Sequence, residues 1–432
     1  MVKNIEKLIF KLLTIKEKKG ITLIALIITV VILLILSSII ISSVSNENGI
    51  IAKIREAKSR INESQINEQV QLITLAARLE NNELDPKKFI SSIENNLTDD
   101  FEFDGINVII HKETKKEFVI SKDYGISSII EITSVEDLKN VVSNGNYKLM
   151  NDINLSGIEW SPLASFSGTF NGNNYSINGM TINMPESYNL GLFKELNGGI
   201  VKNLALTNVD IKGYREVGAL AGAMTNGALV ENCFVTGNLD IYAYSGGITA
   251  VIINDSIIRN CYTICNFSVS TEGGIWASTG GIASYSAWGT SYGIIENCYS
   301  TSTINAKGYY VGGIMGYNEY NNNIRNCYAL NSSISGNGVG RIVSNTNGEN
   351  NYAYKDMKVN EEILESTDIN SKNGLDITVE NAKTQSHYET NTNWKFNDDG
   401  PWTFNYENMN VEEDTNLPIL KSFKTVMQNP KI

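Results

Sequence analysis

The chain has 432 residues, which is enough for two or three domains. Its formal net charge is −12, and its basic residues cluster only near the N-terminus, so we exclude nucleic acid as a partner. The two histidines, His111 and His387, lie far apart in the sequence and leave little for histidine-based catalysis or a histidine metal site.

The first predicted elements are a cytoplasmic leader, residues 1–20, and an apolar transmembrane helix, Ile21–Val44. Residues 21–41 carry no charge and no proline, and about 20 apolar residues are enough to cross a bilayer as a helix. Lysines dominate the leader, whereas the first charge after the segment is Glu47. This asymmetry predicts a single-pass cell-membrane protein in contact with membrane lipid, with a cytoplasmic N-terminus and an extracellular bulk.

The junction between leader and apolar segment resembles the N-terminus of type IV prepilins. It reads Lys18-Lys19-Gly20 followed by Ile21-Thr22-Leu23-Ile24-Ala25-Leu26. The resemblance implies cleavage after Gly20 by a prepilin peptidase, methylation of the new N-terminal residue Ile21, and association with other pilin subunits in a pilus. Ala25 departs from the family, which usually carries glutamate there. A plain signal anchor that keeps its leader is the alternative.

Two further elements precede the main domain. Residues 21–80 are predicted to continue as one long helix, because apolar residues recur at helical spacing as far as Ala77. A small α+β unit is predicted at residues 81–130. Its helix begins at Pro86, a residue favoured at the first helical position, and its β-hairpin turns at residues 112–116.

Internal repetition predicts that residues 131–350 form a β-solenoid, and hence a mainly β protein. A glycine cluster, then a segment Ile/Val-x-Asn, usually followed by Cys and an aromatic residue, recurs at intervals of 28–37 residues. The repeated asparagines are Asn203, Asn232, Asn260, Asn297 and Asn326. Each repeat is too short to bury its own apolar face, so successive repeats are expected to stack as coils around one core.

Stacking predicts structural roles for three sets of repeated residues. Side-chain amides of the asparagines are expected to bond from coil to coil. Four cysteines share one repeat position and are expected to form a buried ladder rather than disulfides, with Cys265 off the ladder. These four are Cys233, Cys261, Cys298 and Cys327. The residues before the asparagines alternate in charge, which predicts an exposed ladder of opposite charges. They are Lys202, Glu231, Arg259, Glu296 and Arg325.

The repeats resemble the GLUG family, in which a Gly-Gly-Ile-like cluster precedes Ile-x-Asn-Cys-Tyr. The best copy joins Gly312–Gly316 with Ile324–Tyr328, and the resemblance covers about residues 185–330. It implies a right-handed parallel β-helix on a secreted or surface protein. Such proteins are often adhesive, so the implied partner is a surface glycan or a protein ligand.

Residues 351–432 are predicted to close the solenoid as a C-terminal cap, with a short helix at Met357–Glu365. Aromatic residues gather around Trp394 and Trp402. We expect them to cover the last coil, because an open coil presents unpaired strand edges. An aromatic platform for carbohydrate is the alternative.

The sequence contains no familiar catalytic motif: neither His-Glu-x-x-His nor Gly-x-Ser-x-Gly nor a phosphate loop occurs. We therefore expect no catalysis, no cofactor and no metal. The resulting hypothesis is a pilin-like surface protein, a minor or tip subunit or a membrane-anchored one, that displays a β-helix for adhesion or binding. The alternative is a membrane-tethered, carbohydrate-active β-helix enzyme with clustered carboxylates.

Overall fold

The computed structural model describes residues 65–78, 86–120, 126–127, 129–270, 277–287, 289–320, 323–398 and 400–432. The chain forms two compact units, residues 1–116 and 117–432. The leader, the prepilin-like junction at Gly20 and Ile21, and the apolar segment Ile21–Val44 all lie outside the described residues. Within the described ranges, no helix is long and apolar enough to cross a membrane.

In its described residues, 65–78 and 86–116, the first unit contains two helices and a pair of strands. Residues 65–78 are helical, and Ile66, Val70, Ile73 and Ala77 form the buried stripe of that helix. Helix α4 follows, and then two short antiparallel strands, β1 and β2. The bounds are α4 Pro86–Asn96, β1 Phe101–Phe103 and β2 Val108–His111.

The second unit opens with an antiparallel pair, β3 (Glu117–Ile120) and β4 (Ile126–Ser127), and continues into the solenoid. Helix α5 (Val135–Lys139) covers the start of the solenoid. The helix begins there because Ser134 and Asp137 form a capping box, in which each side chain accepts a hydrogen bond from the other residue's backbone N–H.

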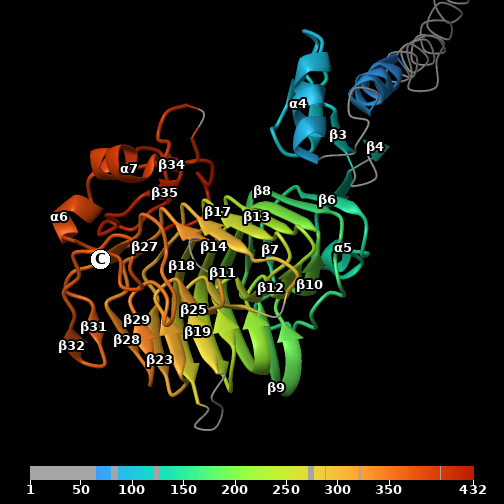
Figure 1. The fold of residues 1–432 in the computed structure, drawn as a ribbon. Coiled ribbons are helices and arrows are strands. Elements are labelled where there is room, and N and C mark those ends of the chain that lie inside the picture. The colour runs from blue at the N-terminus through green and yellow to red at the C-terminus, as the bar shows by residue number, and fades with distance from the viewer. Residues whose placement is uncertain are drawn as a thin grey trace, which may run out of the picture. The chain divides into compact units, whose positions relative to one another are not determined.

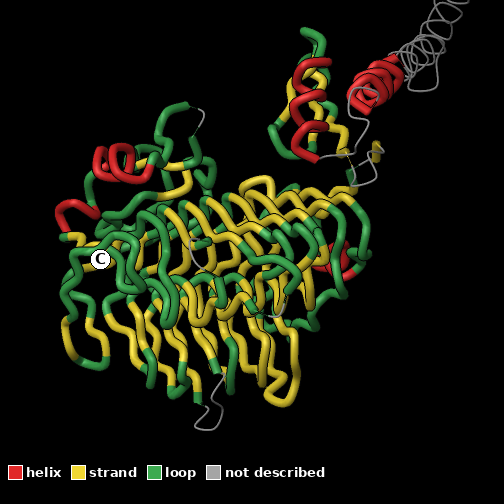
Figure 2. Tube along the Cα trace, in the orientation of Figure 1, coloured by secondary structure: helices red, strands yellow, loops and turns green. Residues whose placement is uncertain are grey.

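The solenoid has about seven turns of parallel strands, which lie side by side from coil to coil (Figures 1 and 2). The first strands are β5 Ile130–Ile132, β6 Asn146–Leu149, β7 Ile153–Asn154, β8 Thr169–Asn178, β9 Thr181–Leu190 and β10 Phe193–Asn197. The middle coils contain β11 Ile200–Gly218, β12 Ala221–Thr225, β13 Leu229–Glu231, β14 Phe234–Ile241, β15 Ser245–Gly246, β16 Thr249–Ile252, β17 Ile257–Arg259, β18 Tyr262–Val269, β19 Ser278–Gly280 and β20 Ala283–Ser286.

The later coils contain β21 Ile294–Glu296, β22 Tyr299–Ser300, β23 Thr303–Ala306, β24 Tyr310–Gly312, β25 Met315–Asn318, β26 Ile324–Arg325, β27 Tyr328–Ala329, β28 Ser333–Ser335, β29 Val339–Gly340, β30 Tyr352–Tyr354, β31 Lys358–Val359, β32 Glu362–Ile363 and β33 Leu375–Ile377. One face is a five-stranded parallel sheet in the order β10-β12-β16-β20-β25. The repeat read from the sequence is therefore the coil of the fold.

The core is built from one apolar residue per coil at each inward position. Val230, Ile258 and Ile295 are register partners on successive coils, and each is at least 99% buried. The repeated glycines turn the chain sharply beside this core. A Cβ atom on Gly312 would lie 1.9 Å from the Met315 carbonyl oxygen, so no larger residue fits there.

The segment Met357–Glu365 is not the predicted helix but an antiparallel hairpin of β31 and β32. Its two turn residues, Asn360 and Glu361, have φ values of 50° and 67°. Two successive residues with positive φ are typical of a tight hairpin turn, and such a turn cannot continue a right-handed helix.

The C-terminal segment lies along the flank of the solenoid rather than only over its last coil. Its elements are α6 Val379–Ala382, α7 Gln385–Thr392, β34 Trp402–Thr403 and β35 Ile419–Leu420 (Figure 1). Phe423 packs edge-on against Phe234 of β14, whereas Tyr388 contacts Tyr328 of β27. The predicted cap therefore covers several coils. It buries a row of aromatic side chains that project from one side of those coils.

Candidate functional site

The repeated asparagines share an unusual backbone conformation. Asn203, Asn232, Asn260, Asn297 and Asn326 all have φ close to +53°, in the left-handed region. Their amide ladder is incomplete: the Asn232 Nδ2 to Asn203 Oδ1 distance is 3.3 Å and the Asn297 Nδ2 to Asn260 Oδ1 distance is 3.5 Å. Asparagine is among the few residues that tolerate this conformation, so the turn selects it at least as much as the ladder does.

The alternating charges meet across neighbouring coils, and they are exposed in part. Arg259 Nε donates to Glu231 Oε1 at 2.6 Å, and Arg325 Nη2 donates to Glu296 Oε2 at 2.7 Å. Lys202 is only 2% exposed and Glu231 only 7%. The side chains of Arg259 and Arg325, in contrast, are 33% and 39% exposed. The ladder is part of the fold and offers no binding site.

All five cysteines are buried and unbridged. In the ladder of Cys233, Cys261, Cys298 and Cys327, each Sγ–H donates to the carbonyl two residues earlier at 3.1–3.2 Å. Burial raises the pKa of the Cys233, Cys261 and Cys298 thiols well above its ordinary value. Protonated, covered thiols are neither nucleophiles nor metal ligands.

The aromatic residues that come directly after the ladder cysteines form a second ladder, of stacked rings, which was not predicted from the sequence. Phe234 stacks on Tyr262 with ring centroids 4.8 Å apart, and Tyr262 stacks on Tyr299 at 4.9 Å. The C-terminal segment covers these rings: Tyr299 Oη donates to the Pro418 carbonyl at 2.7 Å. The signal was present as the aromatic residue after each cysteine. Because the rings are buried, they do not form an exposed carbohydrate platform.

A second set of tyrosines remains exposed on an edge of the solenoid where successive coils turn. Tyr188 and Tyr214 meet edge to face at 5.3 Å, and Tyr214 stacks on Tyr242 at 4.8 Å. Tyr188 is 53% exposed and Tyr242 is 40% exposed. The sequence signal was a tyrosine three or four residues before the glycine cluster of each of these repeats.

Two charged residues, Arg215 and Glu216, follow Tyr214 in the sequence, and Arg215 contacts the ring of Tyr244, which is only 6% exposed. The Arg215 guanidinium lies 4.7 Å from the centre of the Tyr244 ring. The next residue, Glu216, has φ of +51°, an uncommon conformation for glutamate, and burial raises the pKa of its carboxyl. We call Tyr188, Tyr214, Arg215, Glu216, Tyr242 and Tyr244 the tyrosine edge. Strained backbone beside exposed aromatic rings is a common feature of binding sites.

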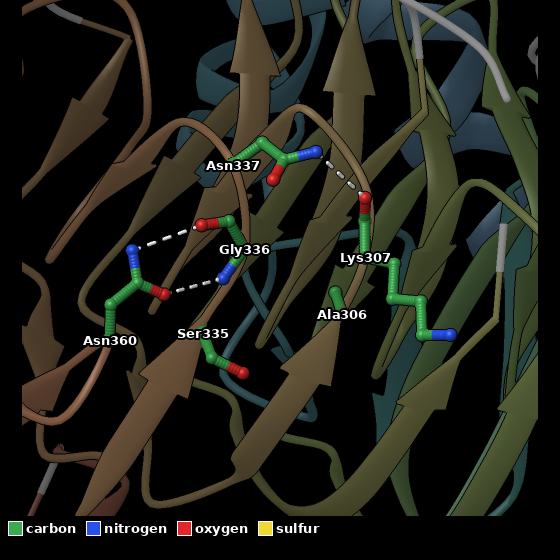
Figure 3. A pocket seen from close by; sticks show the side chains of 6 residues that line it. All are labelled: Ala306, Lys307, Ser335, Gly336, Asn337 and Asn360. Atoms are coloured by element: carbon green, nitrogen blue, oxygen red, sulfur yellow. Dashed lines mark hydrogen bonds between the residues drawn. The ribbon is translucent and has the colours of Figure 1, made fainter. Parts of the chain in front are cut away.

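A shallow pocket of about 380 Å³ lies at the turns of later coils (Figure 3). It is lined by Ala306, Lys307, Ser335, Gly336, Asn337 and Asn360. Asn360 Oδ1 accepts from the Gly336 N–H at 2.9 Å, and its Nδ2 donates to the Gly336 carbonyl at 3.0 Å. Because the amides serve the turns themselves, the pocket is a weaker candidate than the tyrosine edge.

The two histidines have local structural partners. His111 Nδ1 lies 2.8 Å from Thr114 Oγ1, and Asn391 Nδ2 donates to the His387 carbonyl at 2.8 Å. Burial lowers the pKa of His387. In the part of the chain that the structure describes, no three His, Cys, Asp or Glu side chains are arranged to hold a metal ion.

Comparison with known proteins connects this solenoid with peptidases. A family described as the M26 IgA1-specific metallo-endopeptidase N-terminal region matches residues 126–237, which form the first coils and include Tyr188 and Tyr214. The immunoglobulin A1 protease of Streptococcus pneumoniae is 28% identical over 168 residues, which are 35% of this chain and 7% of the protease. Halomucin of Haloquadratum walsbyi is 28% identical over 142 residues, 29% of this chain and 2% of halomucin.

The fold is also found in a solved structure. The crystal structure of a Bacteroides ovatus protein, described as a candidate immunoglobulin A1 protease, superposes with a TM-score of 0.51 at 23% identity. The superposition covers 69% of this chain and 93% of that chain. The chain spans only a small part of the length of the curated relatives it matches.

These findings correct the functional hypothesis. A non-enzymatic, pilin-like adhesin is wrong, because the matching family and a curated relative are endopeptidases. The β-helix is supported. Prepilin processing, methylation, GLUG-type adhesion and a carbohydrate-active enzyme are not supported. The repeat pattern did not indicate the function, because its residues are required by the coil. Asparagines in the left-handed conformation and close-packed glycines are needed by this fold whatever the protein does.

Proposed function

We propose that the protein takes part in extracellular proteolysis of the M26 type, in which the β-solenoid engages the protein substrate. One observation carries the proposal: the M26 N-terminal region matches residues 126–237, where the structure has the first coils of the solenoid. Stacked coils provide a long, rigid surface, which suits them to hold a large substrate while a peptide bond is cut.

The family description also implies a metal ion, and the described residues do not fit one. They contain no metal-holding group, and the thiols that could bind zinc are buried, with four of them held protonated by raised pKa values. We therefore assign no step of peptide hydrolysis to these residues. Their proposed contribution is to bind and orient the substrate.

The test is whether the full chain binds an immunoglobulin substrate. The purified chain is immobilised, and immunoglobulin A1 is passed over it, with immunoglobulin G as the matched control. The proposal predicts saturable binding of immunoglobulin A1 at least tenfold tighter than that of immunoglobulin G. Equal or undetectable binding of both proteins would contradict it.

We also propose that Ile21–Val44 anchors the chain in the cell membrane, with residues 1–20 in the cytoplasm. The support is the uncharged run and the lysine-rich flank. Protease added to intact cells should remove the solenoid and leave the leader protected. Release of the whole chain by alkaline carbonate would contradict the anchor. We further propose that the solenoid is right-handed, as crossovers between parallel strands nearly always are.

A further inference from the structure

One strand at the N-terminal end of the solenoid is left without a neighbour on its outer side. β8 pairs with β6 and β7 of the earlier coil, and β10 is bridged at Phe193 by Leu163. Among the described residues, β9 meets the earlier coil only at its first residue, where Glu159 bridges to Thr181. The earlier coil then passes directly to Leu163 and omits a strand beside the rest of β9, which ends its row of strands (Figure 1). We call residues 182–190 the open edge.

Two hydrogen bonds show which way the backbone groups of β9 point. The Asp210 N–H of β11 donates to the Met180 carbonyl at 2.9 Å. On the opposite side, the Trp160 N–H of the earlier coil donates to the Thr181 carbonyl at 2.7 Å. Successive residues of a parallel strand alternate between its two neighbours. Even-numbered residues as far as Met184, the last before an irregularity in the register, therefore face β11, and odd-numbered residues face the open side.

Two residues of the open edge present backbone groups that no described residue pairs with. Asn183 directs its N–H and its carbonyl to the open side, and Pro185 directs its carbonyl there. Pro185 has no N–H, but its position faces away from β11, so the proline removes no bond from the solenoid. The open edge thus offers one donor and two acceptors at the spacing of a β-strand.

The core beside the open edge is not fully covered. Ile182, Ile211 and Leu239 are register partners on three successive coils, and all three are buried. Met184 also packs against the core but is only half-buried. An apolar side chain from a strand beside β9 would cover Met184 in the way that the inward residues of later coils cover one another.

The charges around the open edge are mixed, with a small acidic excess. Glu186 on β9 and Glu159 at its closed end are exposed. On β11, Asp210 and Lys212 are exposed and Arg215 is half-buried. Three acidic and two basic groups disfavour a strongly acidic ligand and fit one that is neutral or weakly basic.

The chemistry of the open edge selects an extended polypeptide. Unpaired N–H and carbonyl groups in a row along a strand are matched by the backbone of another strand. A second copy of this chain is the weaker match. If β9 paired with β9, Pro185 would leave both strands short of a donor, and Glu186 of both copies would lie along one contact. A strand from another protein brings its own donors.

We propose that the open edge of β9 binds an extended segment of the protein substrate, which adds to the sheet as one strand. Its backbone bonds to Asn183 and Pro185, and one of its apolar side chains covers Met184. The identity of the partner rests on the proposed function, to which the inference adds the place and the mode of binding. Because few hydrogen bonds form, the contact is reversible, as a substrate requires.

Fluorescence anisotropy of a labelled peptide tests the proposal on the full chain in detergent. The probe is an octapeptide that copies residues 236–243 of the solenoid and carries Asp240→Lys to suit the acidic excess. It contains Leu239 and Ile241, which occupy inward positions in register with β11. The control peptide has the same sequence with N-methyl groups on these two residues, which removes their donors. We expect the probe to bind at least tenfold more tightly than the control peptide.

Three variants locate the site. Asn183→Pro removes the outward N–H without removing a bond to β11, and it should weaken binding of the probe at least tenfold. The matched control Asn183→Ser changes the side chain but keeps that N–H, so it should change affinity less than twofold. Pro185→Val adds a donor to the open edge and should tighten binding at least threefold. Binding of immunoglobulin A1 should weaken at least fivefold in Asn183→Pro.

The inference is overturned if Asn183→Pro and Asn183→Ser bind the probe equally, or if the N-methylated peptide binds as tightly as the probe. A wild-type dimer that Asn183→Pro dissociates, seen by sedimentation, would also overturn it, because a second copy would then occupy the edge. Melting temperatures separate lost binding from lost folding. If Asn183→Pro does not fold, Pro185→Val and the N-methylated peptide decide the outcome.

The two proposals fail in different ways. Immunoglobulin A1 that binds wild type and Asn183→Pro equally would overturn the inference and leave the proposed function standing. Probe binding that is lost in Asn183→Pro, without any binding of immunoglobulin A1, would contradict the proposed function and support the open edge as a polypeptide site.

Discussion

The left-handed asparagine that ends the short strand Ile/Val-x-Asn fixes the direction in which each coil turns. Each of the five asparagines holds φ near +53°, and the residue two positions before it, such as Ile295 before Asn297, enters the core. An L-residue other than Asn, Asp or Gly pays about 1–2 kcal/mol for this conformation. The repetition of asparagine was visible in the sequence, but the reason for it was not. A positive φ angle shows in a sequence only as the type of residue at that position.

Substitutions of Asn297 separate the backbone requirement from the amide contacts. Asn297→Ala should lower the free energy of unfolding by about 1–2 kcal/mol, because alanine resists positive φ. Asn297→Gly removes the same amide but allows the angle, so its cost should be about 0.5 kcal/mol. Urea unfolding of both variants measures the difference. Equal losses would show that the amide ladder, not the turn, selects asparagine.

The buried thiols make stability depend on alkaline pH. Burial raises the pKa of Cys265 to about 12, whereas the pKa of a thiol in the unfolded chain is about 8.5. The unfolded chain therefore releases its thiol protons first, and stability is complete below about pH 8.5 and declines as pH rises toward 12. Urea midpoints measured from pH 7 to 10.5 should fall. Cys265→Ala should reduce the slope, and an unchanged slope would contradict the assignment.

At the scale of elements, side chains that stack between coils also join the C-terminal segment to the solenoid. Tyr262 Oη donates to Gln428 Oε1 at 3.0 Å, and Trp394 Nε1 donates to the Asn326 carbonyl at 3.0 Å. The sequence predicted a hydrophobic closing segment but not its position. An aromatic cluster can pack against any exposed apolar surface. Its position was not predicted because the sequence analysis did not identify the flank of the coils as an apolar surface.

Removing one ring of this ladder should loosen the C-terminal segment. Tyr299→Ala deletes a fully buried ring that stacks on Tyr262 and bonds to Pro418, so we expect a loss of about 3–5 kcal/mol. Limited proteolysis should then cut residues 379–432 before the solenoid.

Tyr299→Phe keeps the ring and loses only the hydrogen bond, at a cost of about 1 kcal/mol. The exposed Tyr242→Ala is the matched control and should leave the cleavage pattern unchanged. Equal protection of the C-terminal segment in wild type and in Tyr299→Ala would show that the ladder does not hold it.

At the scale of the whole molecule, the repeat predicted the solenoid because the spacing of the repeated residues equals the length of one coil. Gly-rich turns and Asn-Cys-aromatic segments recur once per coil, and register partners such as Phe234 and Tyr262 follow that spacing. The tyrosine edge could have been read in the same way, from tyrosines that precede successive glycine clusters. Arg215 could not, because its place over the Tyr244 ring depends on how two coils stack.

Function did not follow from the repeat, because a solenoid is a scaffold that serves many activities. The hairpin at residues 357–365 shows a similar limit on a smaller scale. Its turn has positive φ at Asn360 and Glu361, and glutamate is not a residue type that indicates positive φ. The similarity to the peptidase family came from a comparison over residues 126–237, which the repeat spacing alone does not give.

The most direct test of the account is the binding of immunoglobulin A1 to the full chain, compared with the binding of immunoglobulin G, because the account gives the solenoid the role of holding the protein substrate. It predicts saturable binding of immunoglobulin A1 at least tenfold tighter than that of immunoglobulin G. Equal or undetectable binding of the two proteins would contradict it.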